Sequence, residues 1–254
     1  MKFNTDVLHA EQVHARLWGS YEPAAMAHVS PIYQTSTYVL EDFDTAVYLN
    51  QHVDEGFSYT RFGSPNCDEL EKKIAHLEHA EAALALASGL GAISTAVMSI
   101  VKAGDHVVFG DVIYGCSYAL FAKVLTKLGI TYTRVDTSKA EEVEKAIQPN
   151  TSLVYVETPA NPTLKISDIA AIAEIVHRRS GITMIVDSTF ASPYLQNPWT
   201  WARIWLSTVP PNISAATVLL PPASLPAARP ASTTAGCPIF SASALCWTPS
   251  RPGS

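Results

Sequence analysis

The stretch ALASGLGAIST carries the residues that most directly suggest a binding chemistry. Ser88, Gly89 and Gly91 stand just ahead of an apolar segment that we expect to be helical. The backbone N–H groups of such a loop and the positive end of the helix can hold a phosphate. The loop also half matches the dinucleotide pattern G-x-G-x-x-G, with Asp111 downstream as the ribose-binding acid but Ser94 at the third glycine position. A tight turn, in which glycine only permits a positive φ, is the remaining interpretation.

Short β-branched runs and helical stretches must position this loop. The runs HVVFGD, ITYTRVD, SLVYVET and TMIVDS alternate with the helical patterns CSYALFAKVLTKLG, SKAEEVEKAIQ and SDIAAIAEIVHRR. This alternation predicts an α/β fold with a mostly parallel sheet and helices on both faces. Ligands bind at the carboxyl ends of such strands, where Asp111, Glu157, Asp187 and the turn TPANP end or follow the runs.

Two segments lack the alternation of short strands and helices that marks the rest of the fold: the N-terminal part of the chain and the glycine-loop segment. Residues 1–58 show weak periodicity and many turn residues, which predicts an extended N-terminal arm, whereas PNCDELEKKIAHLEHAE has the apolar spacing of a helix. The uncharged segment 82–101 is long enough to span a bilayer, but it contains serines, a threonine and two glycines. We therefore expect a buried helix led by a loop here, not a membrane span.

Composition favours small-molecule chemistry. The chain has 254 residues, of which 48% are hydrophobic and 16% charged, and its net charge of -6 provides no basic field for nucleic acid or a membrane surface. Its four cysteines include no CxxC pair, so neither a disulfide scaffold nor a metal site is predicted. The polar start MKFNTDVLHAEQ lacks the apolar core of a secretory signal, and we expect a cytoplasmic protein.

Five blocks, in this order and spacing, resemble the Cys/Met-metabolism family of pyridoxal-phosphate enzymes: SYTRFGSPN, LALASGLGAI, GDVIYGCSYALF, YVETPANPT and VDSTFASPYLQNP. The family includes cystathionine γ-synthase, cystathionine γ-lyase, O-acetylhomoserine sulfhydrylase and methionine γ-lyase. The resemblance implies an aminotransferase-like large domain over residues 59–198 without its C-terminal domain. It also implies pyridoxal 5'-phosphate as cofactor, a sulfur-containing amino acid as substrate, and assembly as a homodimer or homotetramer.

The resemblance implies roles for the residues around the cofactor ring. Asp187 resembles the carboxylate that keeps the pyridine nitrogen protonated, and Thr189 lies in the same block. Tyr114 resembles the aromatic that stacks on the ring, and Asn161 resembles the amide that binds its phenolic oxygen. Cys116 stands at the spacing from Tyr114 that resembles methionine γ-lyase. The structural alternatives are a loop-capping aspartate, a half-buried tyrosine, a turn asparagine and a small core cysteine.

The resemblance also implies how the cofactor phosphate is held. Ser88, Gly89 and Leu90 would present the start of the helix to it. Tyr59 and Arg61 resemble a pair that reaches the phosphate of a neighbouring subunit, a role that suits arginine because its planar fork grips phosphate at two points. A surface Tyr–Arg pair without a ligand is the alternative.

The chain departs from the family after Pro198. The family carries its Schiff-base lysine in a motif like H-S-A-T-K-Y, but no lysine follows Lys165, and residues 188–254 hold no Asp, Glu or Lys and 11 of the 17 prolines. Permitted codons from residue 199 onward, read one base earlier, give L-D-L-G-A-D-M-A-L-H-S-A-T-K-Y, with the lysine at the junction of residues 211 and 212. We therefore interpret residues 199–254 as a non-homologous tail produced by a single-base deletion near codon 198. A natural proline-rich terminal segment is the alternative.

The expected function is γ-elimination from a sulfur amino acid, as in methionine γ-lyase, by a chain that is catalytically incomplete as written. Cystathionine γ-synthase or lyase and O-acetylhomoserine sulfhydrylase are the neighbouring alternatives. Two other classes stay open: an NAD-dependent oxidoreductase, which would bind a dinucleotide and no pyridoxal phosphate, and a non-catalytic remnant, which would bind neither.

Overall fold

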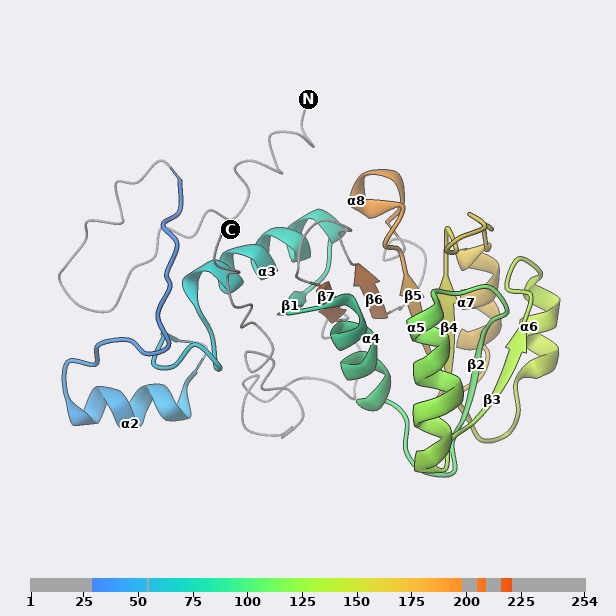
Figure 1. The fold of residues 1–254 in the computed structure, drawn as a ribbon, viewed down its shortest axis with the longest axis horizontal. Coiled ribbons are helices and arrows are strands. Elements are labelled where there is room, and N and C mark those ends of the chain that lie inside the picture. Colours follow the sequence, from blue (N-terminus) through green and yellow to red (C-terminus); the bar gives the residue numbers. More distant parts are fainter. Residues whose placement is uncertain (1–28, 54, 198–204, 209–215, 221–254) are drawn as a thin grey trace, which may run out of the picture.

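The computed structural model describes residues 29–53 and 55–197, together with the backbone of residues 205–208 and 216–220 (Figure 1). Its helices are α2 (Phe43–Gln51), α3 (Pro65–Glu78), α4 (Gly89–Met98), α5 (Gly115–Ala119), α6 (Ala140–Ala146), α7 (Ile169–His177) and α8 (Ser192–Leu195). A π-helical turn (Leu120–Val124) and a 3-10 turn (Leu125–Leu128) continue α5. The strands are β1 (Ala82–Leu86), β2 (His106–Gly110), β3 (Thr131–Val135), β4 (Thr151–Glu157), β5 (Thr183–Asp187), β6 (Trp205–Thr208) and β7 (Ala216–Leu220).

The seven strands form one sheet in the order β1-β7-β6-β5-β4-β2-β3. The pairs β2–β3, β2–β4, β4–β5 and β5–β6 are parallel, whereas β7 runs antiparallel to both β6 and β1. The prediction of a mostly parallel sheet is therefore confirmed. The carboxyl ends of β2, β4 and β5 meet at one edge, since parallel neighbours share their direction.

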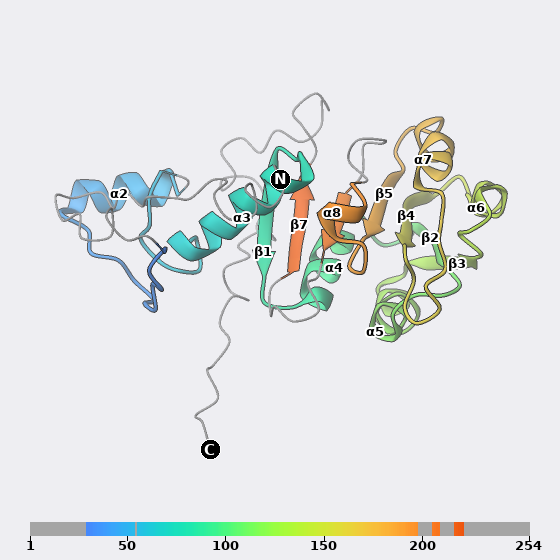
Figure 2. The same ribbon diagram turned by 90° about the horizontal axis from the view of Figure 1, so that it is seen from above.

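Alternation along the strands builds a hydrophobic core on each face. On β4, Leu153 and Tyr155 pack with α4 and the segment after α5, while Val154 and Val156 pack with α6 and α7. The turned view shows α4 and α5 on one side of the sheet and α6 and α7 on the other (Figure 2). The predicted helices on both faces are confirmed, and the side chains of β4 and β5 at odd numbers face α4 and α5.

Two elements differ from the sequence prediction. Residues 82–86 form a strand, not the loop expected ahead of α4: the run AALAL has little β-branching, and its strand conformation comes from pairing with β7. The expected extended arm contains α2, which begins where the Asp42 carboxylate accepts the Thr45 N–H at 2.7 Å. Leu49 is the residue of α2 that is buried, so the amphipathic signal was too weak to predict the helix.

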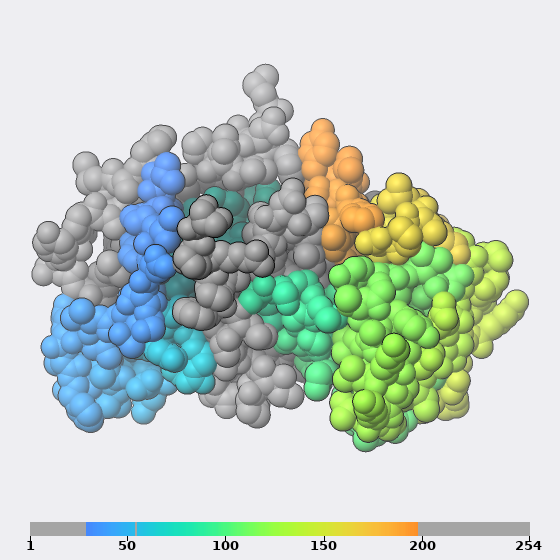
Figure 3. All heavy atoms as spheres, viewed as in Figure 1, coloured from blue at the N-terminus to red at the C-terminus, as the bar shows by residue number. Residues whose placement is uncertain are grey.

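The arm and the sheet occupy opposite ends of the described structure. The helix α2 and its flanking chain lie at one end, and α6 and β3 lie at the other (Figure 1). The space-filling view shows the blue arm and the green-to-yellow sheet domain as the two ends of the described surface (Figure 3). In the described part of the chain, no helix is long and apolar enough to cross a membrane.

The predicted domain boundary at residue 198 lies next to segments that the structure does not describe. Of the tail, the backbone of β6 and β7 is described and extends the sheet, whereas residues 199–204, 209–215 and 221–254 lie outside the described residues. The origin of the tail in a shifted reading frame stays a prediction.

Candidate active site

Two buried carboxylates end adjacent parallel strands. Glu157 closes β4 and Asp187 closes β5, and the two residues are direct partners in the register of the strands. Alternation turns both toward the α4 and α5 face, and their exposed fractions are 5% and 4%. Charged side chains are almost never buried to this extent without partners, so this pair marks the edge of the sheet where chemistry can occur.

The Asp187 carboxylate accepts hydrogen bonds from three donors. The Thr189 backbone N–H and hydroxyl both donate to Oδ1, the N–H at 3.1 Å, and the Tyr155 hydroxyl donates to Oδ2 at 2.8 Å. An ionised carboxyl group offers about four acceptor positions. The described residues therefore leave one acceptor position on Oδ2 without a donor.

Burial and hydrogen bonding act in opposite directions on Asp187. Removal from water raises the pKa of this carboxyl group above its usual value, and the bonds from Thr189 and Tyr155 lower it in part. The pKa of the Tyr155 phenol is raised, first by burial and then by the negative charge of Asp187. Tyr155 thus keeps its proton and serves as a permanent donor, and an N–H cation at the open position would favour the ionised form of Asp187.

Glu157 connects two segments that sequence analysis placed around a ligand. Its Oε2 accepts the Tyr114 N–H and its Oε1 accepts the Asn161 N–H, both at 2.8 Å. Burial raises the pKa of Glu157 to about 7, the two N–H groups lower it, and the charge of Asp187 raises it. Predicted site residues from α5, β5 and the TPANP turn are therefore brought to one edge of the sheet.

The Tyr114 ring lies open at this edge. Tyr114 directly precedes α5 and is 44% exposed, and Cys116 is a free, exposed thiol. A hydrogen bond with Cys116 raises the pKa of the Tyr114 phenol. Asn161 is half-buried in the turn after β4. The exposed ring can stack on a planar ligand, and the exposed thiol is not the small core residue that was the structural alternative for Cys116.

The glycine loop begins α4 as predicted. Ser88 is the N-cap: its hydroxyl accepts the Gly91 N–H at 3.1 Å, and its carbonyl accepts the Ala92 N–H at 3.0 Å. A Cβ at Gly91 would lie 3.0 Å from the Ser88 Oγ, so a residue without a side chain suits this position. Gly89 and Leu90 form the first turn, whose backbone N–H groups have no acceptor within the helix and can donate to an anion.

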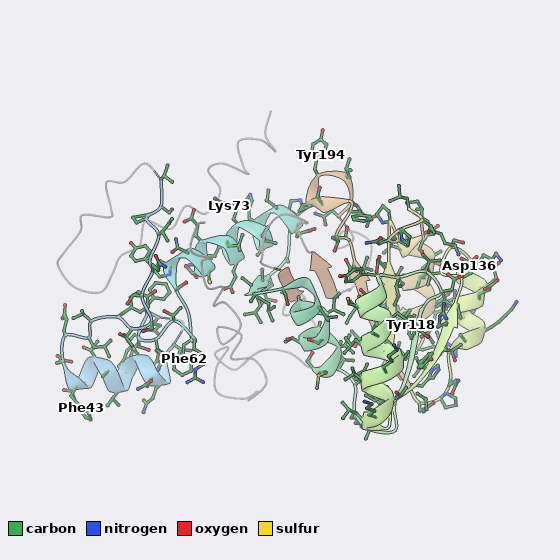
Figure 4. All side chains as sticks on the ribbon, viewed as in Figure 1. Phe43, Phe62, Lys73, Tyr118, Asp136 and Tyr194 are labelled. Carbon is green, nitrogen blue, oxygen red and sulfur yellow. The ribbon has the colours of Figure 1, made fainter. Side chains whose placement is uncertain are left out.

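Asp111 has another partner. Lys165 contacts Asp111 at 3.2 Å and Asp136 at 2.6 Å, linking the ends of β2 and β3 to the turn after β4. Asp136 is seen at the α6 end of the molecule (Figure 4). The strand that leads into the glycine loop, β1, pairs antiparallel with β7. Asp111 is thus in an ion pair, and the loop lacks the parallel βαβ setting of the dinucleotide motif, which argues against the ribose-binding role.

Tyr59 and Arg61 lie far from these residues within one chain. Tyr59 forms a bridge with Thr37 of the arm, and the Arg61 guanidinium lies over the rings of Tyr59 and Phe62, 5.5 Å and 4.7 Å from their centres. Phe62 lies beside α2, at the opposite end of the molecule from Tyr118 on α5 (Figure 4). Within this chain the pair does not join Asp187 and Glu157.

Sequence reasoning missed Tyr155 as a site residue and recognised Glu157 only as a polar strand end. The signal for both was present in the strand alternation, because Tyr155 and Glu157 are separated by one residue of the same strand and must share a face. The contacts of Glu157 with Tyr114 and Asn161 depend on how two loops fold back, which no local pattern specifies.

Three comparisons relate the chain to known proteins. The sequence profile of the Cys/Met metabolism PLP-dependent enzymes matches residues 10–202. L-methionine gamma-lyase of Porphyromonas gingivalis is 47% identical over 183 residues, which are 71% of this chain and 45% of that protein. Cystathionine gamma-lyase of Bacillus subtilis is 45% identical over 188 residues, 74% of this chain and 46% of that protein.

A solved structure supports the same relationship. The crystal structure of metB from Corynebacterium glutamicum has a TM-score of 0.74 and 35% sequence identity, over 86% of this chain and 55% of that one. This chain spans about half the length of the curated relatives that it matches.

Proposed function

Because the chain belongs to the Cys/Met metabolism PLP-dependent enzyme family, we propose that residues 59–198 are the cofactor-binding part of an enzyme that cleaves a carbon–sulfur bond in a sulfur amino acid. When bound, pyridoxal phosphate supplies an electron sink for negative charge that develops at the α-carbon of the substrate. The observation that carries the proposal is the buried Asp187 carboxylate, which keeps one acceptor position on Oδ2 without a donor among the described residues, at the sheet edge where Glu157 also binds the Tyr114 main chain.

The residues at the edge of the sheet fit this cofactor. Asp187 would hold a proton at the ring nitrogen, with Thr189 and Tyr155 keeping its carboxylate in place. Tyr114 would cover one face of the ring, and the Asn161 amide would bind the phenolic oxygen. The phosphate would bind at the first turn of α4, formed by Gly89 and Leu90, next to the cap made by Ser88.

The exposed groups beside the ring favour γ-elimination. The Tyr114 hydroxyl and the Cys116 thiol interact with each other and lie outside the core, so they can exchange protons with a bound substrate. This pairing supports a methionine γ-lyase-like activity. The same cofactor contacts would serve a cystathionine γ-synthase or lyase, or an O-acetylhomoserine sulfhydrylase.

We infer that no lysine of the chain as written holds the cofactor covalently. The last lysine in the sequence is Lys165, and its ammonium group is bound between Asp111 and Asp136, which raises its pKa. A protonated, ion-paired amine is a poor nucleophile. We therefore expect cofactor binding without complete turnover.

A second copy of the chain would complete the phosphate site. Tyr59 and Arg61 contact Phe62, which lies at the end of the molecule opposite Tyr118 of α5 (Figure 4), so they would serve a partner subunit in a homodimer or homotetramer. The arm also exposes large apolar residues that a partner would cover: Ile32, Val39 and Phe43 are 87%, 93% and 80% exposed. The exposed thiol of Cys116 suits the reducing cytoplasm.

Equilibrium dialysis of the whole chain against pyridoxal phosphate tests the proposal. Asp187→Asn should weaken binding at least tenfold, because an amide at this position presents donors where Tyr155 and Thr189 already donate. Asp111→Asn is the matched control, since it changes a strand-end carboxylate that pairs with Lys165. Binding of a nicotinamide dinucleotide in place of pyridoxal phosphate would overturn the assignment.

A further inference from the structure

A single carboxylate ties three chain segments together at the site. Glu157 lies in β4, in register with Asp187 of β5. Its Oε2 reaches Tyr114, which comes much earlier in the sequence, and its Oε1 reaches Asn161 in the turn that follows β4. Both contacts are to backbone N–H groups, so they fix main-chain positions and not only side-chain rotamers.

These two bonds fix the start of α5 and the turn after β4. Tyr114 provides no side-chain cap for α5, and the carboxylate of Glu157 accepts the N–H at the start of this short helix. Asn161 lies in the turn after β4, where Ala160 and Lys165 share a backbone bond of 3.0 Å. Without the carboxylate, the Tyr114 and Asn161 N–H groups would each lose the acceptor that the structure gives them.

We propose that Glu157 is a positioning residue that sets the Tyr114 ring and the Asn161 amide at fixed places relative to Asp187. The proposal rests on the proposed function, because these three residues are the ones assigned to the face, the phenolic oxygen and the nitrogen of the cofactor ring. Glu157 itself touches backbone groups and acts through its two partners.

The geometry requires two acceptors on one side chain. A carboxylate has two equivalent oxygens, whereas the amide of glutamine has one oxygen and one NH₂ group. Glu157→Gln therefore keeps at most one of the two bonds and turns a donor toward the other N–H. Glu157→Asp keeps two acceptors but is one methylene shorter, so it reaches the two N–H groups less well.

Four titratable groups lie around Glu157. Asp187 lies on β5, and Tyr155 lies on β4 with Glu157 itself. Tyr114 and Cys116 lie at the start of α5. Among the described residues, no ion pair involves Glu157. The charge on Asp187 raises the pKa of Glu157. The backbone N–H groups of Tyr114 and Asn161 should both sense the protonation of the Glu157 carboxylate.

Amide hydrogen exchange on the whole chain tests the two bonds directly. We expect exchange at Tyr114 or Asn161 to be about tenfold faster in Glu157→Gln than in the wild type, because one bond is lost. Glu71→Gln is the matched control: Glu71 is a half-buried carboxylate whose pKa is also raised to about 7, but it holds one backbone N–H, that of Ala85 at 2.8 Å. Unchanged exchange at both sites in Glu157→Gln would overturn the proposal.

A second measurement needs only the wild-type chain and covers the case in which Glu157→Gln does not fold. With ¹⁵N-labelled tyrosine and asparagine, the amide signals of Tyr114 and Asn161 should move with pH and share one midpoint near the pKa of Glu157, which is about 7. Different midpoints, or no movement of either signal, would contradict the pair of hydrogen bonds to Glu157.

Dialysis against pyridoxal phosphate then connects positioning to binding. We expect Glu157→Gln to weaken binding about tenfold, Glu157→Asp to weaken it less, and Glu71→Gln to leave it unchanged. Faster exchange in Glu157→Gln together with wild-type affinity would overturn the positioning role. A wild-type chain that binds no pyridoxal phosphate but shows the shared titration would instead contradict the proposed function. The two hydrogen bonds to Glu157 would still be supported.

Discussion

Tyr155 donates its hydroxyl hydrogen bond to Asp187 across adjacent strands at 2.8 Å, and Tyr155 is entirely buried. The phenol is therefore a donor that binds the Asp187 carboxylate from within the hydrophobic core. Burial raises the pKa of both groups, so the bond joins a protonated phenol to a carboxyl group whose charge is costly in this position.

Removal of this hydroxyl should destabilise the fold. Tyr155→Phe preserves the packing of the ring but removes a donor from a buried carboxylate, which should lower the free energy of unfolding by about 1.5–3 kcal/mol. Urea unfolding measures the loss. Tyr132→Phe is the control, since its half-buried ring packs on the same core. Equal losses in the two variants would mean that the bond to Asp187 has no special weight.

The half-buried Glu71 should make stability depend on pH. Its pKa is about 7 in the folded chain, against 4.5 for an ordinary glutamate, because burial disfavours the charge. The folded state therefore keeps a proton that the unfolded state releases, and stability should fall as pH rises from about 4.5 to 7. Glu71→Gln keeps the bond to Ala85 and removes this dependence.

Urea unfolding of the wild type and Glu71→Gln at several pH values measures the effect. The stability of Glu71→Gln relative to the wild type should rise through this window by at most about 3 kcal/mol and then stay constant. A difference that is independent of pH would show that Glu71 titrates normally.

The start of α4 provides a third prediction. Ser88→Ala removes the cap on the Gly91 N–H and should lower the free energy of unfolding by about 1 kcal/mol. Ser99→Ala is the matched control at the other end of the helix, where the Ser99 hydroxyl donates to the Ala96 carbonyl. A larger loss in Ser99→Ala than in Ser88→Ala would contradict the capping role.

Sequence analysis predicted the elements whose local pattern agrees with their setting. The strands β2 to β5 are short and rich in β-branched residues, and Ser88 precedes an apolar helix. The type and approximate position of these elements could therefore be predicted from the sequence. The run AALAL of β1 has no such preference, and its pairing with β7 decided its conformation. The helix α2 buries mainly Leu49 and therefore shows no strong apolar stripe.

The candidate site was predictable only where the chemistry lies at a strand end. Strand alternation placed Asp187 at a strand end, whereas its role at the cofactor nitrogen came from the family resemblance and stays a prediction. The two hydrogen bonds of Glu157 could not be predicted, because Tyr114 comes from a loop far away in the sequence and is placed by tertiary folding. Tyr155 reads as an ordinary core aromatic until Asp187 is seen beside it.

The lysines of the chain as written should not hold the cofactor at the site. Lys165 is the lysine held at this edge by Asp111 and Asp136, and these carboxylates raise its pKa. Incubation with pyridoxal phosphate and borohydride should give no adduct specific to Lys165, and methionine should release no thiol. Peptide mass spectrometry identifies any reduced adduct. A single modified lysine together with thiol release would disprove the prediction.

Restoring the reading frame should restore a complete cofactor site. Inserting one base at codon 198 would return acidic residues to the chain and place a lysine at the junction of residues 211 and 212, within the motif H-S-A-T-K-Y. The backbone of β6, which follows residue 198, already pairs in parallel with β5, so a strand in this place would deliver the lysine to the edge that holds Asp187. The cofactor would then be held at its nitrogen, ring face, phosphate and aldehyde carbon together, which fixes the geometry of the reacting atoms.

The repaired chain should gain an absorbance band of covalently bound pyridoxal phosphate and release a 2-oxo acid from methionine. The matched control is the same insertion with an alanine codon in place of the lysine codon, which should restore the tail but not the band. Cys116→Ala in the repaired chain should lower activity with methionine and leave the band intact, because Cys116 interacts with the Tyr114 hydroxyl and is not among the groups proposed to hold the cofactor. A repaired chain that binds no pyridoxal phosphate would contradict the proposed site. One that binds it and ignores methionine would contradict only the choice of a methionine γ-lyase-like activity.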